Sequence, residues 1–201
     1  MVRETSRLVF LDVDGVLNSI EWQHELHEQG KRRDMHPDDL INPEMMERLN
    51  RIVEVGKADV VVSSAWRTGR QVDQLQALFE RHGFRGRVVG KTGHGFNGER
   101  GMQILNWLEL TGNEKATFVV LDDEQSDMGR VMGVLVKTDG QVGLTDEDVK
   151  RAVTILKTPN EIRIVEANPK MAMSEAVLDA SVESARQGKM PRFVTSEMDE
   201  T

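Results

Sequence analysis

Residues 8–18 read Leu-Val-Phe-Leu-Asp-Val-Asp-Gly-Val-Leu-Asn, and this stretch decides the fold. Its first four residues are all apolar, which is typical of a short strand buried on both faces of a parallel sheet. Acidic residues and a glycine follow at once, so the strand is expected to end in a loop that carries Asp12 and Asp14. Four further short runs are mostly apolar in the same way, at residues 60–62, 87–89, 118–121 and 134–136.

Between these runs, apolar residues recur at the spacing of an α-helix. The clearest helix follows Asn42, which suits an N-cap, with Pro43 at the first helical position and Gly56 as the expected stop. Further helices are predicted near residues 72–83, 100–112 and 145–156, the last one capped by a threonine. Strands that alternate with helices in this way indicate an α/β fold of three layers, doubly wound around a mostly parallel sheet.

Composition limits the class of protein. The chain has 201 residues, a length that suits one ordinary domain. Its net charge of -8 means that the protein lacks a global basic field for nucleic acid. It contains no cysteine, which excludes disulfides, thiolate metal sites and a cysteine nucleophile. No apolar run approaches the roughly 18 residues of a membrane span. The first apolar run is too short for the core of a signal peptide, so a cytoplasmic location is expected.

The sequence predicts one main domain with an appended segment. Residues 1–157 form the predicted domain, and polar residues 18–42 within it form an excursion that is partly helical. Residues 158–201 are predicted to be a C-terminal extension, with an edge strand at 161–167, a helix at 173–186 and a frayed end. No function can be assigned to this extension.

Polar residues follow three of the predicted strands. In doubly wound sheets, ligands bind in the crevice outside the carboxyl ends of the strands. Carboxylates crowded there repel one another, and a hard cation with oxygen ligands removes the conflict, as Mg²⁺ does with carboxylates, water and phosphate. We therefore predict a magnesium site at these strand ends. The residues at the three strand ends are Asp12 and Asp14, Ser63 and Ser64, and Asp122 and Asp123.

The spacing of Asp12 and Asp14 suggests a division of roles. With Val13 turned away, the two carboxylates can face the same cavity. One carboxylate can attack phosphorus to give an aspartyl-phosphate, while the other handles the proton of the leaving group.

A phosphoryl group also needs donors and a cation. Ser63 or Ser64 could donate a hydrogen bond to a phosphoryl oxygen, and a cation would balance the charge of the transition state. Arg100, just ahead of a predicted helix, is the first candidate for this cation, and Lys91 is the second. We assign Ser64, Lys91 and Arg67 to substrate binding.

Residues 10–18 closely resemble the first motif of the haloacid dehalogenase (HAD) superfamily, Asp-x-Asp-Gly-x-Leu. Residues 60–63 resemble the second motif, Arg100 resembles the third, and residues 121–124 resemble the acidic fourth motif, all in the expected order. The resemblance implies a HAD-like phosphatase that requires Mg²⁺.

The same resemblance implies a role for each matching residue. Asp12 would be the nucleophile, and Asp14 would be the general acid and base. Magnesium would be held by Asp12, by the backbone carbonyl of Asp14, and by Asp122 or Asp123. Ser63 and Arg100 would bind the phosphoryl group.

Finer details resemble one subgroup of small HAD phosphatase domains. These details are residues 63–67, 100–101, 121–124 and 143–145. The subgroup occurs in bacteria and phages, and includes domains of multidomain "Swiss army knife" RNA repair proteins. The resemblance implies that there is no large cap domain, so residues 18–42 would supply at most a small flap. An open site of this kind would admit a large substrate, such as a nucleic-acid end.

Several alternatives remain open at this point. The substrate could be a phosphorylated small molecule or a nucleic-acid end: residues 67–100 carry seven basic against three acidic residues, whereas the net charge of -8 opposes nucleic acid. A non-catalytic, receiver-like module that binds phosphate or magnesium is the alternative function. Such modules normally carry their acidic pair and phosphoacceptor on different strands. Neither a membrane nor an obligate protein partner is expected.

Several weaker sequence signals accompany these motifs. The glycine-rich residues 93–98 lack the Lys-Ser/Thr pair of a P-loop and are interpreted as a loop beside the site. His24 and His27 are spaced for metal binding but lack further ligands. Trp66 either packs in the core, which we favour, or stacks on a base. Asp127 either supports the metal site indirectly or starts a helix.

Overall fold

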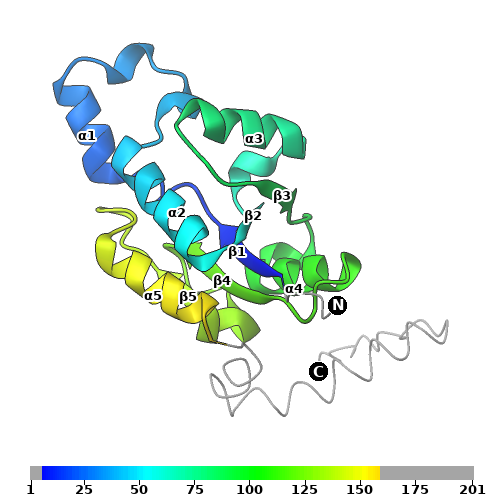
Figure 1. Cartoon of the computed structure of the whole chain (residues 1–201). Helices are drawn as coiled ribbons and strands as arrows, with labels where there is room; N and C mark the ends of the chain where they lie inside the picture. The colour runs from blue at the N-terminus through cyan, green and yellow to red at the C-terminus, as the bar shows by residue number, and fades with distance from the viewer. Residues whose placement is uncertain (1–5, 159–201) are drawn as a thin grey trace, which may run out of the picture. The chain divides into compact units, whose positions relative to one another are not determined.

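The computed structural model describes residues 6–158, which contain a five-stranded sheet with β1 at its centre. The strand order is β3-β2-β1-β4-β5, and all four neighbouring pairs are parallel. The predicted doubly wound parallel sheet is therefore confirmed. The strands are β1 Arg7–Leu11, β2 Asp59–Val62, β3 Val88–Lys91, β4 Thr117–Asp122 and β5 Leu135–Lys137 (Figure 1).

Helices cover both faces of this sheet. The connections β1 to β2 and β3 to β4 cross the sheet in opposite directions, so right-handed crossovers place α2 and α4 on opposite faces. Helix α5 packs beside α2, as Figure 1 shows. The α-helices of the described residues are α1 Ile20–Glu28, α2 Pro43–Gly56, α3 Val72–Arg81, α4 Arg100–Leu110 and α5 Asp146–Leu156.

The four apolar residues of the central strand β1 are buried. Phe10 in β1 is fully buried, and its ring meets Trp107 of α4 and Phe118 of β4 edge to face, with centroids 5.6 and 5.5 Å away. Edge-to-face aromatic pairs add to the stability that burial alone provides. The residues that follow β1 therefore start from a well-anchored strand end.

Helix α2 begins as predicted but ends one residue later. The Asn42 side chain accepts hydrogen bonds from the backbone N–H groups of Glu44 and Met45 at the predicted cap. Gly56 belongs to the helix, and the left-handed residue after it is Lys57, with φ 50°. A Cβ at Gly56 would lie 2.5 Å from Cδ1 of Leu156, so this glycine permits close contact with α5.

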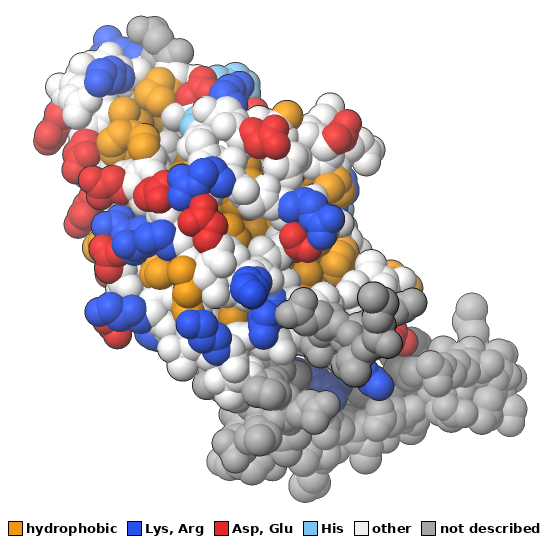
Figure 2. Space-filling model, viewed as in Figure 1, with side chains coloured by type: hydrophobic (Ala, Val, Ile, Leu, Met, Phe, Trp, Pro, Cys, Tyr) orange, Lys and Arg blue, Asp and Glu red, His pale blue; other side chains and the backbone are white. Residues whose placement is uncertain are grey.

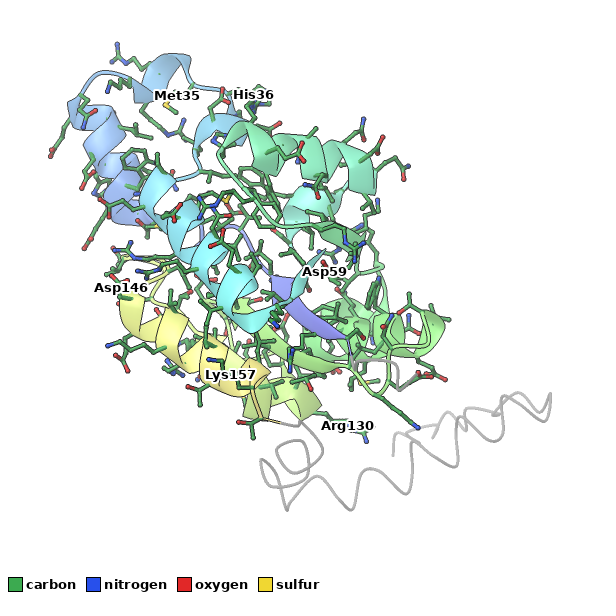
Figure 3. All side chains as sticks on the ribbon, viewed as in Figure 1. Met35, His36, Asp59, Arg130, Asp146 and Lys157 are labelled. Carbon is green, nitrogen blue, oxygen red and sulfur yellow. The ribbon has the colours of Figure 1, made fainter. Side chains whose placement is uncertain are left out.

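The excursion over residues 18–42 contains only short elements. It holds α1 and two 3₁₀ helices, η1 Arg32–Asp34 and η2 Pro37–Asp39, near the labelled residues Met35 and His36 in Figure 3. Within residues 6–158, no large cap domain is inserted.

The elements predicted for the C-terminal extension lie outside the described residues. This applies to the edge strand at 161–167 and to the helix at 173–186, and the boundary after residue 157 stays a prediction. Among the helices of residues 6–158, none combines the length and the apolar character needed to cross a membrane.

Candidate active site

Three carboxylates converge at the carboxyl edge of the sheet. Because β1 and β4 are neighbours in register, Asp12 follows one strand directly beside the end of the other, where Asp122 and Asp123 lie. One carboxylate oxygen from each residue lies within 4.8 Å of the other two. The parallel pairing of β1 with β4 thus produces the predicted meeting of acids from distant parts of the chain.

Burial makes this cluster electrostatically unfavourable without a cation. Asp122 has no exposed surface, and loss of hydration, followed by the nearby charge of Asp12, raises its pKa from 3.8 to about 7. The pKa of Asp123 is also raised, by burial first and by Asp12 second. A set of oxygen ligands that resists being charged in a small space suits a hard divalent cation.

Arg100 lies against the acid cluster. Its Nη1 donates to Oδ2 of Asp12 at 2.6 Å and to Oδ2 of Asp122 at 2.5 Å. The same nitrogen thus touches the predicted nucleophile and a predicted metal ligand. One guanidinium balances only part of the charge that three carboxylates can carry.

Gly101 allows the start of α4 to pack closely enough for Arg100 to reach the acid cluster. A Cβ at Gly101 would lie 2.1 Å from the backbone oxygen of Met128, so only glycine allows this approach. The N–H of Gly101 donates to the backbone oxygen of Asp127 at 3.0 Å.

The Asp127 carboxylate lies 4.0 Å from Nε of Arg100, and its Oδ1 is buried without a partner. Asp127 therefore faces the site, and no α-helix begins there.

Gly15 is required by both its conformation and its neighbours. Its φ is +73°, in the left-handed region that favours glycine. A Cβ at this position would lie 2.4 Å from the carboxyl carbon of Asp123. The glycine of the Asp-x-Asp-Gly stretch thus leaves room for an acid that is supplied by β4.

Asp14 stands apart from the three clustered carboxylates. Its side chain is exposed, and it does not belong to the group of oxygens within 4.8 Å. Its Oδ1 accepts from Nδ2 of Asn18 at 2.9 Å, and its Oδ2 accepts from Nε1 of Trp66 at 3.0 Å. Asp14 is therefore held beside the cluster as a separate carboxylate.

The two serines after β2 have different surroundings. Ser63 is fully buried, and its Oγ accepts from Oγ1 of Thr92 at 3.4 Å. Ser64 caps the 3₁₀ helix η3 Ala65–Arg67, because its Oγ accepts from the backbone N–H of Trp66. Both serines are fully buried and both hydroxyl oxygens act as acceptors in these contacts, so each O–H can still donate to a ligand.

The predicted substrate-binding residues Arg67 and Lys91 turn to backbone carbonyls. Arg67 is buried and donates to the carbonyls of Ser64, Thr92 and Gly93. Burial is the main cause of the lowered pKa of Arg67. Nζ of Lys91 donates to the carbonyls of Arg67 and Arg70. In this arrangement both cations brace the loops after β2 and β3.

Three polar residues near the site were missed by the sequence reading. Asn18 orients Asp14, Thr92 reaches Ser63, and the amide of Gln103 accepts from Arg67 at 2.9 Å and donates to the carbonyl of Gly95 at 3.1 Å. Thr92 and Gln103 carry no local signal, because their partners come from other elements, whereas Asn18 lies four residues after Asp14 in the same loop. The histidines His24 and His27 join no cluster of metal ligands among the described residues.

Comparison with known proteins gives one match. The model of a family described as "HAD domain in Swiss Army Knife RNA repair proteins" matches residues 8–149. Neither the curated proteins nor the solved structures contain a match. The matched range runs from β1 into α5 and so includes every site residue described above.

Proposed function

This chain belongs to the family of HAD domains found in Swiss Army Knife RNA repair proteins, and from that premise we propose that it is a magnesium-dependent phosphomonoester hydrolase. The observation that carries the proposal is the cluster of Asp12, Asp122 and Asp123 with Arg100 in contact. Family membership implies a phosphatase-type hydrolase.

Asp12 is the proposed nucleophile. Its Oδ1 accepts from the N–H of Val13 at 2.7 Å, and its Oδ2 accepts from Arg100, so the carboxylate is held at both ends. One oxygen attacks phosphorus and forms a P–O bond, while the bond to the leaving-group oxygen breaks with its electron pair. The product of this step is an aspartyl-phosphate on Asp12 and a free alcohol.

Asp14 is the proposed general acid and base. It donates a proton to the leaving oxygen in the first step and then removes one from the water that attacks the aspartyl-phosphate. That attack releases inorganic phosphate and regenerates the Asp12 carboxylate. The separation of Asp14 from the acid cluster suits this role, because a proton carrier must remain open to exchange.

The cluster also fits the proposed cofactor. Asp12, Asp122 and Asp123 would hold Mg²⁺, with the main-chain carbonyl of Asp14 as the further ligand that the family resemblance implies. Bound there, the ion would offset the charge of the carboxylates and of the phosphoryl oxygens. The raised pKa values of Asp122 and Asp123 support this fit.

Ser63 and Arg100 are proposed to bind the phosphoryl group. The Ser63 hydroxyl can donate to one oxygen, and the Arg100 guanidinium carries further N–H groups beyond the one that faces the acids. Fixed donors aimed at developing charge are a large contribution to catalysis. A nucleic-acid end is the substrate that the family's description favours, with phosphorylated small molecules as the competing class.

The decisive experiment is phosphate release from para-nitrophenyl phosphate with Mg²⁺. Replacing the nucleophile in Asp12→Asn should lower kcat/KM by on the order of 10³-fold or more. The matched control is Asp59→Asn, because Asp59 starts β2, away from the carboxyl ends of the strands, and pairs with Arg87 (Figure 3). Equal activity of Asp12→Asn and the native protein would refute the proposal.

A substrate panel separates the two substrate classes. We expect phosphate release from 3′-phosphorylated oligonucleotides at a higher kcat/KM than from free nucleotides or sugar phosphates. Added salt should weaken only the nucleic-acid reaction, because only that substrate releases condensed counterions on binding. Equal rates on all substrates would favour a small-molecule phosphatase.

A stable phosphoprotein would instead support the receiver-like alternative. Such a module accepts phosphate on an aspartate and holds it without turnover. Asp12 and Asp14 both follow the central strand β1, an arrangement that favours turnover because a candidate acid lies beside the nucleophile.

A further inference from the structure

The carboxylate of Asp14 is held by two side chains from different parts of the chain. Asn18 donates to Oδ1 from the loop after β1, and Trp66 donates to Oδ2 from η3 after β2. A carboxylate has about four acceptor positions, so both contacts leave room for a leaving-group oxygen. The two donors fix the plane of a side chain that is otherwise exposed and free to rotate.

Trp66 is itself held from two directions. Its backbone N–H donates to Oγ of Ser64 at 3.3 Å, which fixes the start of η3. Its ring lies 5.8 Å from the guanidinium carbon of Arg70, within the range of a cation–π contact. Nη1 of Arg70 also donates to the backbone oxygen of Trp66 at 2.8 Å.

Arg70 connects this tryptophan to the excursion. Its Nη2 donates to Oδ1 of Asp38 at 2.6 Å, and both side chains are less than one-third exposed. The neighbouring residue Asp39 pairs with Arg81 of α3 at 2.9 Å, and Nε2 of His82 lies 2.8 Å from the backbone oxygen of Asp38. The η2 segment is thus tied to α3 and, through Arg70 and Trp66, to Asp14.

We propose that Trp66 is a positioning residue that holds the general acid Asp14, and that the Asp38–Arg70 pair of the excursion keeps Trp66 in place. This inference rests on the proposed function. It adds a polar role for Trp66 to the packing role that the sequence favoured, because the side chain also packs, partly buried, against the hydrophobic core. It also gives residues 18–42 a task without a cap domain: they stabilise the acid from outside the site.

The test compares substrates that need a general acid to different degrees. Para-nitrophenol leaves readily without protonation, whereas the alcohol of glycerol phosphate must receive a proton as it leaves. In Trp66→Phe, which keeps a ring but lacks the N–H group, kcat/KM for glycerol phosphate should fall by about tenfold, as for loss of one hydrogen bond to a charged group. For para-nitrophenyl phosphate it should change by less than about twofold.

Two more variants extend the comparison. The quantity to compare is the ratio of kcat/KM for glycerol phosphate to kcat/KM for para-nitrophenyl phosphate. Arg70→Met removes the cation behind Trp66 and should lower this ratio by about threefold. The matched control is Trp22→Phe. It removes the hydrogen bond that Nε1 of Trp22 donates to the backbone oxygen of Leu40 at 2.9 Å. This control removes an equivalent bond from the base of the excursion and should leave the ratio unchanged.

The outcomes separate this inference from the proposed function. If the native protein releases phosphate with Mg²⁺ neither from these two substrates nor from a 3′-phosphorylated oligonucleotide, the proposed function fails. If it hydrolyses both and Trp66→Phe keeps the native ratio, only the positioning role is overturned. Circular dichroism checks the fold of each variant; if Trp66→Phe does not fold, an unchanged ratio in Arg70→Met overturns the inference.

Discussion

Asp122 and Glu47 each contact an arginine, yet their pKa values move in opposite directions. Asp122 lies fully buried at the end of β4, 2.5 Å from Arg100, and its pKa rises to about 7. Glu47 lies on α2, where Arg85 donates to both its oxygens at 2.7 and 2.9 Å, and its pKa falls to about 2. The same pair of chemical groups therefore gives opposite results.

Solvent and neighbouring charge explain the difference. For Asp122, burial is the largest influence and the negative charge of Asp12 is the second, and together they exceed the attraction of Arg100. For Glu47, the hydrogen bonds from Arg85 dominate and water remains in contact.

Charged side chains on the exposed face of the domain are hydrated and paired, as Glu47 is, rather than buried, as Asp122 is. Figure 2 shows acidic and basic side chains interspersed on the face seen in Figure 1. Asp146, labelled in Figure 3 at the start of α5, pairs with Arg48 and Arg51 of α2. Acidic side chains on this surface have basic partners, whereas the carboxyl edge of the sheet holds more carboxylates than cations. Unfavourable charge of this kind is typical of binding sites, because stability and function place different demands on the same residues.

The largest effect should come from removing the cation of the buried cluster. In Arg100→Met, the metal-free protein should lose about 3 kcal/mol of unfolding free energy, the lower end of the range for a broken buried pair. Mg²⁺ should then raise the melting temperature more in Arg100→Met than in the native protein, because the competing guanidinium is gone. Differential scanning fluorimetry with and without Mg²⁺ measures this shift.

The matched control is Arg85→Met on the exposed face. It should change the melting temperature only slightly, because the contribution of exposed pairs is small. Its Mg²⁺ shift should equal that of the native protein. An equal Mg²⁺ shift in Arg100→Met and Arg85→Met would contradict the difference drawn between the two regions.

The next effect concerns pH. The folded-state pKa of Asp122, about 7, exceeds its unfolded value of 3.8. Between these values the folded protein holds a proton that the unfolded chain has released, so metal-free stability should fall as pH rises from about 4 to about 7. Asp122→Asn should flatten this slope, and it should also reduce the shift in melting temperature that Mg²⁺ causes. Urea unfolding with chelator at pH 5 and pH 7.5 measures the slope, and an undiminished slope in Asp122→Asn would contradict it.

The acid cluster could be predicted from sequence because local and general rules suffice for it. Apolar runs located the strands, and the shared edge of a parallel sheet placed Asp12 beside Asp122 and Asp123. Gly15 was part of the same motif, although its contact with Asp123 appears only in three dimensions. Backbone topology alone thus determined the central part of the site.

The directions of long side chains could not be predicted in this way. Arg67 and Lys91 lie near the predicted edge, but their flexible stems turn the charges toward carbonyls of neighbouring loops. The indole of Trp66 reaches Asp14 from η3 after β2, a contact that depends on the path of η3. The close approach of Gly56 to Leu156 likewise joins residues that are remote in sequence. Such contacts follow from tertiary packing rather than from local pattern.

The smallest effect should appear at Glu47, with a pH dependence opposite to that of Asp122. Its folded-state pKa, about 2, lies below the ordinary value of 4.5, so the pair with Arg85 stabilises the fold above about pH 4.5 and this contribution is lost as pH falls toward 2. Glu47→Gln should therefore lower the melting temperature slightly at pH 7, and by less at pH 3.5. The double variant with Arg85→Met completes a thermodynamic cycle for the pair. A deficit that is as large at pH 3.5 as at pH 7 would mean that packing, rather than charge, accounts for the role of Glu47, and the contrast with the buried cluster would then rest on Asp122 alone.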